Sequence, residues 1–165
     1  MIDQPRPEEK EKLVSMARGT GFFTPEEIDV IVELLDSFFG GDPTNSYFFI
    51  AFRETAGSEP LGFACYGPAP MTEGTFDLYW IVVDKAYQNK KIGRALLETV
   101  EAETSLKGGR ALYIETSDLP YYLPTRAFYE RMGYDRAAHL PDYYKIGDGK
   151  ITYRKWLANK NGADM

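Results

Sequence analysis

The chain has 165 residues, of which 44% are hydrophobic and 27% are charged, and its formal net charge is -6. This length and balance are typical of one globular domain with a substantial core, and the acidic balance argues against a general nucleic-acid-binding protein. A single cysteine excludes an internal disulfide, and with one histidine a structural zinc site is a poor fit, so we expect no bound metal.

The N-terminus lacks the basic and apolar regions of a signal peptide, and no apolar run reaches the roughly 18 residues of a membrane span. We therefore expect a cytoplasmic protein with no membrane partner.

Hydrophobic periodicity and turn residues predict a succession of helices and strands. The proline-rich residues 1–7 form a loose lead-in or a short edge strand. A polar loop over 142–149 joins the last two strands, and the tail from Asn159 is expected to fray. The predicted helices span 8–18, 25–39, 92–106 and 124–132. The predicted strands span 47–53, 61–66, 75–83, 110–116, 134–140 and 150–157.

Local signals set several of these boundaries. Thr24 and Glu27 form a capping-box pattern around Pro25, a residue that fits the first position of a helix. The first helix is expected to end near Gly19, and the second at Gly40 and Gly41.

The chain between residues 75 and 116 alternates strand, helix and strand. Because a crossover helix joins strands 75–83 and 110–116, these two strands are expected to be parallel neighbours. No linker, repeat or low-complexity tract interrupts the pattern. The sequence therefore predicts a single α/β domain over residues 1–165 with a mixed sheet.

The loop after strand 75–83 carries the strongest chemical signal. It combines polar and basic side chains with a glycine at the start of a helix. Free backbone N–H groups and cationic side chains at a helix start are suited to bind a pyrophosphate. The residues predicted to bind it are Gln88, Asn89, Lys90, Lys91, Ile92, Gly93, Arg94 and Ala95.

This loop and two later segments resemble the GNAT superfamily of acetyl-CoA-dependent N-acetyltransferases. The family pattern Q/R-x-x-G-x-G/A is similar to 88–93, and a helix holding F/L-Y followed by glycine and an aromatic residue is similar to 128–134. Segment 142–153 resembles the family's closing hairpin. The resemblance covers roughly 47–157. It implies an α/β fold of the α+β type, with a mostly antiparallel mixed sheet, a splayed central parallel pair and flanking helices, and helices within 8–39 would shape the acceptor site.

The sequence departs from the family pattern at two positions. Lys91 stands where the family has its first loop glycine, a residue that permits positive φ or close approach to phosphate. Tyr122 stands where many relatives have an asparagine that touches the cofactor. We expect cofactor binding to survive at Lys91, because a lysine near pyrophosphate brings favourable charge. We expect Tyr122 to help wall the cofactor or acceptor site.

The resemblance implies transfer of an acetyl group from acetyl-CoA, the co-substrate, to a primary amine by direct attack. Ile81, Val82 and Val83 at the strand end would bind the pantetheine arm through their backbone. Tyr129 would protonate the leaving thiolate, because a phenol with an ordinary pKa of about 10 is protonated at neutral pH. Glu115 is the expected base, as in ribosomal-protein-type relatives.

The choice of base and the acceptor stay open. Tyr113 and Glu115 alternate onto one face of their strand, as do Asp77 and Tyr79 on the preceding strand. Asp77 is therefore the alternative base and Glu73 a more distant one, and Asp77, Tyr79 and Tyr122 are acceptor-site candidates. The expected acceptor is a small-molecule amine or a peptide N-terminus.

A non-catalytic acyl-CoA-binding or sensing module is the alternative function. The departures at Lys91 and Tyr122 favour it, whereas Tyr129 and Glu115 argue against it. His139 is expected to be a surface or edge histidine, and Cys65 a small apolar packing residue. The exposed sheet edge or the closing hairpin would allow a homodimer, as in many relatives.

Overall fold

The computed structural model describes residues 1–157, so the expected fraying from Asn159 lies outside the described residues. The α-helices are α1 (Lys10–Thr20), α2 (Pro25–Phe39), α3 (Ile92–Leu106) and α4 (Leu123–Arg131). The strands are β1 (Ile2–Asp3), β2 (Phe48–Phe52), β3 (Gly62–Pro68), β4 (Thr75–Val83), β5 (Ala111–Ser117), β6 (Asp135–Lys145) and β7 (Asp148–Trp156). Short 3₁₀ turns occupy Pro7–Glu9, Lys85–Tyr87 and Pro120–Tyr122. Within residues 1–157, none of the helices combines the length and the apolar character that a bilayer crossing requires.

The strands follow the order β1-β2-β3-β4-β5-β7-β6 in one sheet. Strands β4 and β5 are parallel, with Thr75 opposite Ala111 and Leu78 opposite Ile114 at the two ends of their pairing. The pairs β1–β2, β2–β3, β5–β7 and β6–β7 are antiparallel. The predicted mixed, mostly antiparallel sheet with one central parallel pair is therefore confirmed.

The chain divides into two compact units. Unit 1 comprises residues 1–67 and 80–100, and unit 2 comprises residues 68–79 and the chain from Glu101 onward. Strand β4 and helix α3 each contribute residues to both units. The single domain over residues 1–165 stays a prediction.

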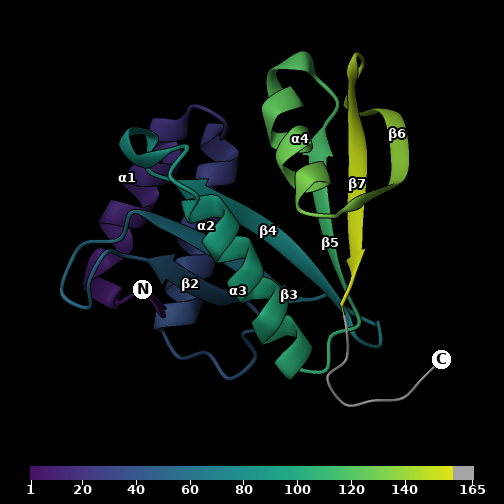
Figure 1. Ribbon diagram of the computed structural model, residues 1–165. Helices are drawn as coiled ribbons and strands as arrows, with labels where there is room; N and C mark the ends of the chain where they lie inside the picture. The colour runs from purple at the N-terminus through teal and green to yellow at the C-terminus, as the bar shows by residue number, and fades with distance from the viewer. Residues whose placement is uncertain (158–165) are drawn as a thin grey trace. The chain divides into compact units, whose positions relative to one another are not determined.

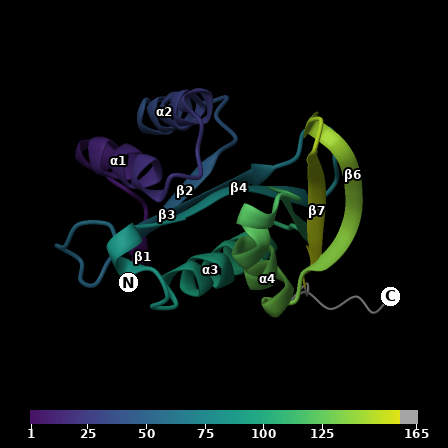
Figure 2. The ribbon, with the colours of Figure 1, turned by 90° about the horizontal axis from the view of Figure 1, so that it is seen from above.

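Unit 1 has helices on both faces of its strands. Figure 2 shows α1 and α2 on one face of β2 and β3, and the first half of α3 on the other face. Ile28, Ile31 and Leu35 bury one stripe of α2. Residues 62–67 of β3 are all buried, as expected for a strand with both faces covered. Cys65 lies within this run, and burial raises the pKa of its thiol. The predicted role of Cys65 as a small apolar packing residue is therefore confirmed.

The two N-terminal helices begin and end at identifiable caps. Thr24 Oγ1 accepts from the Glu27 N–H at 3.2 Å, and the Glu27 carboxylate accepts from the Thr24 N–H at 2.7 Å, which confirms the capping box. The predicted end of α1 near Gly19 falls short of the observed end at Thr20. Gly21, with a φ of 74°, makes the left-handed cap, so the chain reverses at the second of the two glycines.

The loop predicted over 142–149 is wrong. Strand β6 extends to Lys145 and β7 begins at Asp148, so the connection is a two-residue turn. Gly147 has a φ of 84° and donates its N–H to Asp142 Oδ1 at 2.7 Å. Every residue of β6 is exposed. The polar side chains that suggested a loop are therefore those of a strand that faces water.

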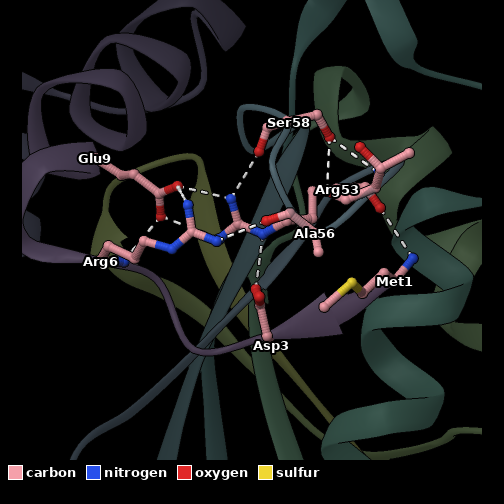
Figure 3. Close-up of polar contacts among 8 residues, drawn as sticks. Met1, Asp3, Arg6, Glu9, Arg53, Ala56 and Ser58 are labelled. Atoms are coloured by element: carbon pink, nitrogen blue, oxygen red, sulfur yellow. Dashed lines mark hydrogen bonds and ion pairs between the residues drawn. The ribbon is translucent and has the colours of Figure 1, made fainter.

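The fully buried guanidinium of Arg53, just after β2, holds the first residues of the chain against that strand (Figure 3). Arg53 is 0% exposed; its Nε lies 2.8 Å from Asp3 Oδ1 and its Nη1 lies 2.6 Å from Glu9 Oε1. Nη1 also donates to the Ser58 carbonyl at 2.8 Å. The Arg53 N–H donates to the Met1 carbonyl at 2.9 Å, next to the β1–β2 pairing. The buried charge is thus matched by two carboxylates, the arrangement that offsets the cost of desolvating an ion.

In unit 2, helix α4 lies against β7. The rings of Tyr129 in α4 and Tyr153 in β7 have centroids 6.0 Å apart. Figure 1 shows β6 on the outer side of β7, in agreement with its terminal place in the strand order. The polar residues of the hairpin therefore belong to an exposed sheet edge.

Candidate active site

The predicted phosphate-binding loop lies in unit 1, between β4 and α3. The Asp84 N–H donates to the Leu61 carbonyl at 2.9 Å, and Asp84 Oδ1 accepts from the Ala86 N–H at 3.0 Å, so the turn leaving β4 is held at both sides. Helical bonding then begins with the Ala95 N–H, which donates to the Lys91 carbonyl at 3.1 Å. The N–H groups just before Ala95 have no acceptor within the helix, the arrangement that favours an anion.

Lys91 adopts a backbone conformation that usually favours glycine. Its φ is 62°, and that of Asn89 is 63°. The left-handed region costs a residue with a side chain about 1–2 kcal/mol, and asparagine tolerates it better than lysine does. The positive φ that a glycine would permit is therefore retained, and the lysine side chain is exposed.

Most side chains of this loop are exposed, whereas the first residue of α3 is buried. Lys90 Nζ lies 4.9 Å from the centroid of the Tyr87 ring, and Arg94 Nε lies 2.8 Å from Glu98 Oε1. Ile92 is 4% exposed. The exposed members of the predicted set are Gln88, Asn89, Lys90, Lys91 and Arg94. The loop thus presents cations to solvent while an apolar anchor holds the helix start.

Glycine at position 62 lets the helix start approach the strands closely. A Cβ on Gly62 would lie 3.0 Å from both the Ile92 Cγ2 and the Val82 carbonyl oxygen. Val82 is 1% exposed, and Ile81 and Val83 are half-buried. The backbone contacts that the family resemblance implies for Ile81, Val82 and Val83 stay a prediction.

Unit 2 contains a pair of carboxylates on one face of β4 and β5. Asp77 lies opposite Tyr113, so Tyr79 and Glu115, each two residues farther along, point to the same side as that pair. Lys150 of β7 adds a cation, with Nζ 3.3 Å from Glu115 Oε1. The structure therefore brings together two carboxylates and a lysine from three strands.

The surroundings of the two carboxylates differ. Burial, followed by the negative charge of Glu115, raises the pKa of Asp77 above its ordinary value, and the charge of Lys150 opposes this without cancelling it. The Glu115 side chain is 56% exposed and ion-paired. A carboxylate with a raised pKa is suited to general-base work near neutral pH, so these surroundings favour Asp77 over Glu115.

Tyr129 occupies the last turn of α4 within a group of aromatic rings. It is 7% exposed, and its ring centroid lies 5.3 Å from that of Phe128 and 6.0 Å from those of Tyr134 and Tyr153. Gly133, with a φ of 88°, reverses the chain after the helix so that Tyr134 packs back on Tyr129. Burial raises the pKa of Tyr129, which keeps the phenol protonated and able to donate.

The predicted acceptor and surface residues of unit 2 lie around the end of β5. Tyr122 is half-buried in the 3₁₀ turn before α4, with its ring centroid 5.7 Å from that of Tyr121. His139 is exposed, as predicted, and its Nε2 lies 2.8 Å from Asp118 Oδ2. Asp118 Oδ1 accepts from the Gly149 N–H at 2.7 Å. These contacts tie the loop after β5 to both strands of the closing hairpin.

The predicted site residues are divided between the units. The cofactor-binding set of the strand end and loop lies in unit 1, whereas the predicted proton-transfer and acceptor residues lie in unit 2. Sequence reasoning missed Lys150 as a partner of Glu115. The contact depends on the β5–β7 register, in which Lys150 lies opposite Ser117, and no local signal in the sequence specifies that register.

Comparisons with known proteins identify the family of the chain. A family model for an acetyltransferase (GNAT) domain matches residues 44–136, more than half of the chain. The crystal structure of a GNAT-family protein from Desulfovibrio desulfuricans is 43% identical in sequence, with a TM-score of 0.91, over 96% of this chain and 99% of that one. Among the curated proteins with which the chain was compared, none matches it.

More distant solved structures share the fold. An aminoglycoside 6'-N-acetyltransferase complexed with coenzyme A is 19% identical, with a TM-score of 0.77, over 98% of this chain and 99% of that one. The ribosomal-protein-S18-alanine N-acetyltransferase from Escherichia coli is 20% identical, with a TM-score of 0.72, over 99% of each chain. The family model and the 43% identical structure show that the chain belongs to the GNAT family of acetyltransferases.

Proposed function

We propose that the protein transfers the acetyl group of acetyl-CoA to a primary amine by direct attack. The observation that carries this proposal is the positive φ of Lys91 at the start of α3. It retains the turn in which backbone N–H groups at a helix start can donate to a pyrophosphate, although a lysine stands in the glycine position. The coenzyme A complex of a protein with the same fold supports the choice of co-substrate.

The loop residues fit a co-substrate that carries phosphate groups. The exposed side chains among them include three cations, Lys90, Lys91 and Arg94, next to N–H groups that have no acceptor within the helix. The backbone of Ile81 and Val83, on the strand end, would bind the pantetheine arm. Acetyl-CoA, when bound, supplies a thioester carbon that is open to attack by a neutral amine.

The residues of unit 2 would move the two protons of the reaction. Asp77 takes a proton from the amine, directly or through a water, as the new C–N bond forms. Tyr129 gives its phenolic proton to the sulfur as the C–S bond breaks. Glu115, the base implied by the family resemblance, would raise the pKa of Asp77 through its negative charge. It remains the alternative base.

The acceptor is an amine that carries positive charge before it is deprotonated. Asp77 and Glu115 supply negative charge on one strand face, and Tyr79 and Tyr122 supply aromatic surface, a combination that favours cationic amines. Proteins with this fold include an aminoglycoside 6'-N-acetyltransferase and a ribosomal-protein-S18-alanine N-acetyltransferase. Both a small-molecule amine and a peptide N-terminus therefore belong in an acceptor screen.

The test is thiol release from acetyl-CoA in the presence of a panel of amines. The panel holds an aminoglycoside, a polyamine, a free amino acid and a peptide beginning with alanine. Tyr129→Phe is expected to lower kcat by about 100-fold or more, because general acid catalysis typically contributes at least that factor, while the Kd for acetyl-CoA stays unchanged. Tyr66→Phe, which alters a fully buried tyrosine of unit 1, is the matched control and should keep its kcat.

Two results would overturn the proposal. Unchanged turnover in Tyr129→Phe would remove the acid role of Tyr129. Binding of acetyl-CoA without turnover on any amine of the panel would favour the alternative function, a non-catalytic acyl-CoA-binding or sensing module.

A further inference from the structure

Two tyrosine rings pack against the ring of Tyr129, the proposed proton donor. Tyr134 lies just before β6, and Tyr153 lies in β7. The Tyr134 ring meets the Tyr129 ring at an interplanar angle of 65°, and the Tyr153 ring meets it at 41°. Tyr134 is 4% exposed and Tyr153 is 0% exposed. Edge and tilted ring contacts of this kind have preferred geometries, so they restrict the orientation of the enclosed phenol.

Each enclosing tyrosine is fixed at its hydroxyl by a carboxylate. The Tyr153 hydroxyl donates to Glu130 Oε1 at 2.9 Å, and the Tyr134 hydroxyl donates to Glu101 Oε1 at 2.9 Å. Burial and the charge of Glu101 raise the pKa of Tyr134, so its hydroxyl remains a donor to that carboxylate. The position of Tyr134 thus depends on what holds Glu101.

Lys155 holds Glu101 and the end of α4 at the same time. Its Nζ donates to Glu101 Oε1 at 3.1 Å and to Oε2 at 3.0 Å, and it also donates to the Met132 carbonyl at 3.0 Å. The Glu101 side chain is 15% exposed and that of Lys155 is 30% exposed, so solvent screens this pair less than a surface ion pair. The same ammonium lies 5.6 Å from the centroid of the Tyr134 ring.

We propose that Lys155 is a positioning residue for proton transfer by Tyr129. Through Glu101 it fixes Tyr134 against the Tyr129 ring, and through the Met132 carbonyl it fixes the turn of α4 that carries Tyr129. The inference rests on the proposed function, in which Tyr129 is the proton donor. A misplacement of about 1 Å in a reacting group can lower the rate by a large factor, so a residue that only anchors the neighbours of Tyr129 can affect kcat.

The kinetic test is a double-mutant cycle. Lys155→Met and Lys155→Arg are made in the wild type and in the Tyr129→Phe background, and kcat is measured with acetyl-CoA and the amine of the panel that turns over fastest. Lys155→Met should lower kcat about tenfold in the wild type with KM little changed. Lys155→Arg, which keeps the positive charge, should lower kcat much less. In the Tyr129→Phe background, Lys155→Met should cause no further fall, because the group that it positions is absent.

A purely structural role for Lys155 gives a different result. An equal fall in kcat in both backgrounds, or no fall in either, would overturn the positioning role. If Tyr129→Phe itself leaves kcat unchanged, the failure lies instead with the proposed function. A loss of activity in Tyr129→Phe without a loss in Lys155→Met overturns the positioning role alone.

A second measurement does not need an acceptor. The ring signals of ¹³C-labelled tyrosine are recorded by NMR, and the Tyr129 signal is identified by its absence in Tyr129→Phe. Lys155→Met should shift or broaden this signal because the enclosing rings lose their anchor. Ile50→Val, a core change in unit 1, controls for general loss of stability and should leave the signal in place. An unchanged Tyr129 signal in folded Lys155→Met would contradict the proposal.

Discussion

Each unit contains a cluster of two carboxylates and one cation, but the pKa of a carboxylate is lowered in one cluster and raised in the other. In unit 1 the buried guanidinium of Arg53 contacts two carboxylates, and its hydrogen bond holds the pKa of Glu9 below the ordinary value. In unit 2 two carboxylates lie near a lysine, yet the pKa of Asp77 is raised. Residue types alone do not distinguish the two clusters.

The difference lies in which carboxylate the cation bonds. Arg53 donates directly to Glu9 at 2.6 Å, and a rigid guanidinium fork can serve two acceptors at once. Lys150 bonds Glu115 and acts on Asp77 only through its charge, so burial and the neighbouring carboxylate prevail at Asp77. The first arrangement fixes an anion for stability, and the second leaves a carboxylate that can exchange a proton.

The largest effect is expected from removing the cation of the unit 1 cluster. Arg53→Met leaves Asp3 and Glu9 without their shared partner and should lower the free energy of unfolding by about 3–5 kcal/mol. Chemical denaturation measures this change. The exposed pair of Arg94 with Glu98 supplies the control, because Arg94→Met should cost no more than about 0.5 kcal/mol. Similar losses in the two variants would remove the distinction between the clusters.

The next effect concerns activity and separates the two carboxylates of unit 2. Asp77→Asn should lower kcat about 100-fold, because the proposed base is lost. Glu115→Gln is the matched variant and should lower kcat by a smaller factor. A larger loss in Glu115→Gln than in Asp77→Asn would reverse the assignment and make Glu115 the base.

Asp77→Asn also predicts the sign of a stability change. Because the folded-state pKa of Asp77 is raised, the stability linked to its protonated form is present below the ordinary value of 3.8 and is lost as pH rises through the folded pKa. At pH 7 the ionised side chain is therefore a net cost. The Tm of Asp77→Asn at pH 7 should be equal to that of the wild type or higher, and a clear fall in Tm would contradict the electrostatic description.

Glu9→Gln should show the opposite dependence on pH. A lowered pKa means that the stability linked to ionised Glu9 is present above the ordinary value of 4.5 and is lost as pH falls through the folded pKa. The variant should be less stable than the wild type by about 2 kcal/mol at pH 7, the size of a charge-assisted hydrogen bond. The difference in stability between the two proteins, measured by chemical denaturation, should begin to shrink as the pH falls below 4.5, and a difference that stays constant would disprove the linkage.

The smallest effect is expected from Lys150→Met. Its charge lowers the pKa of Asp77, so its removal should raise that pKa further. The acidic limb of the kcat/KM profile should then move upward by about half a pH unit, the size expected for one charge in polar surroundings. A shift of the limb to lower pH, or none, would show that Asp77 does not control it.

Strong local signals determined the elements that frame the candidate site. Strand β4 and helix α3 have the predicted bounds, 75–83 and 92–106, because an apolar strand and an amphipathic helix are each bordered by turn residues. The crossover helix between β4 and β5 also implied their parallel pairing, which follows from connection geometry. The family resemblance implied a closing hairpin over 142–153, but hydrophobic periodicity missed the strand character of residues 142–145, because a strand without a buried face has no hydrophobic period.

By itself, the amino-acid sequence determined the family, the loop at the start of α3 and the set of candidate residues. Only the tertiary structure decided which carboxylate Lys150 bonds, because Glu115 and Lys150, 35 residues apart, meet through strand register. The Lys155–Glu101 contact likewise joins residues 54 positions apart. A side chain's type is local, but its pKa and its orientation depend on burial and on charges that distant segments bring to it.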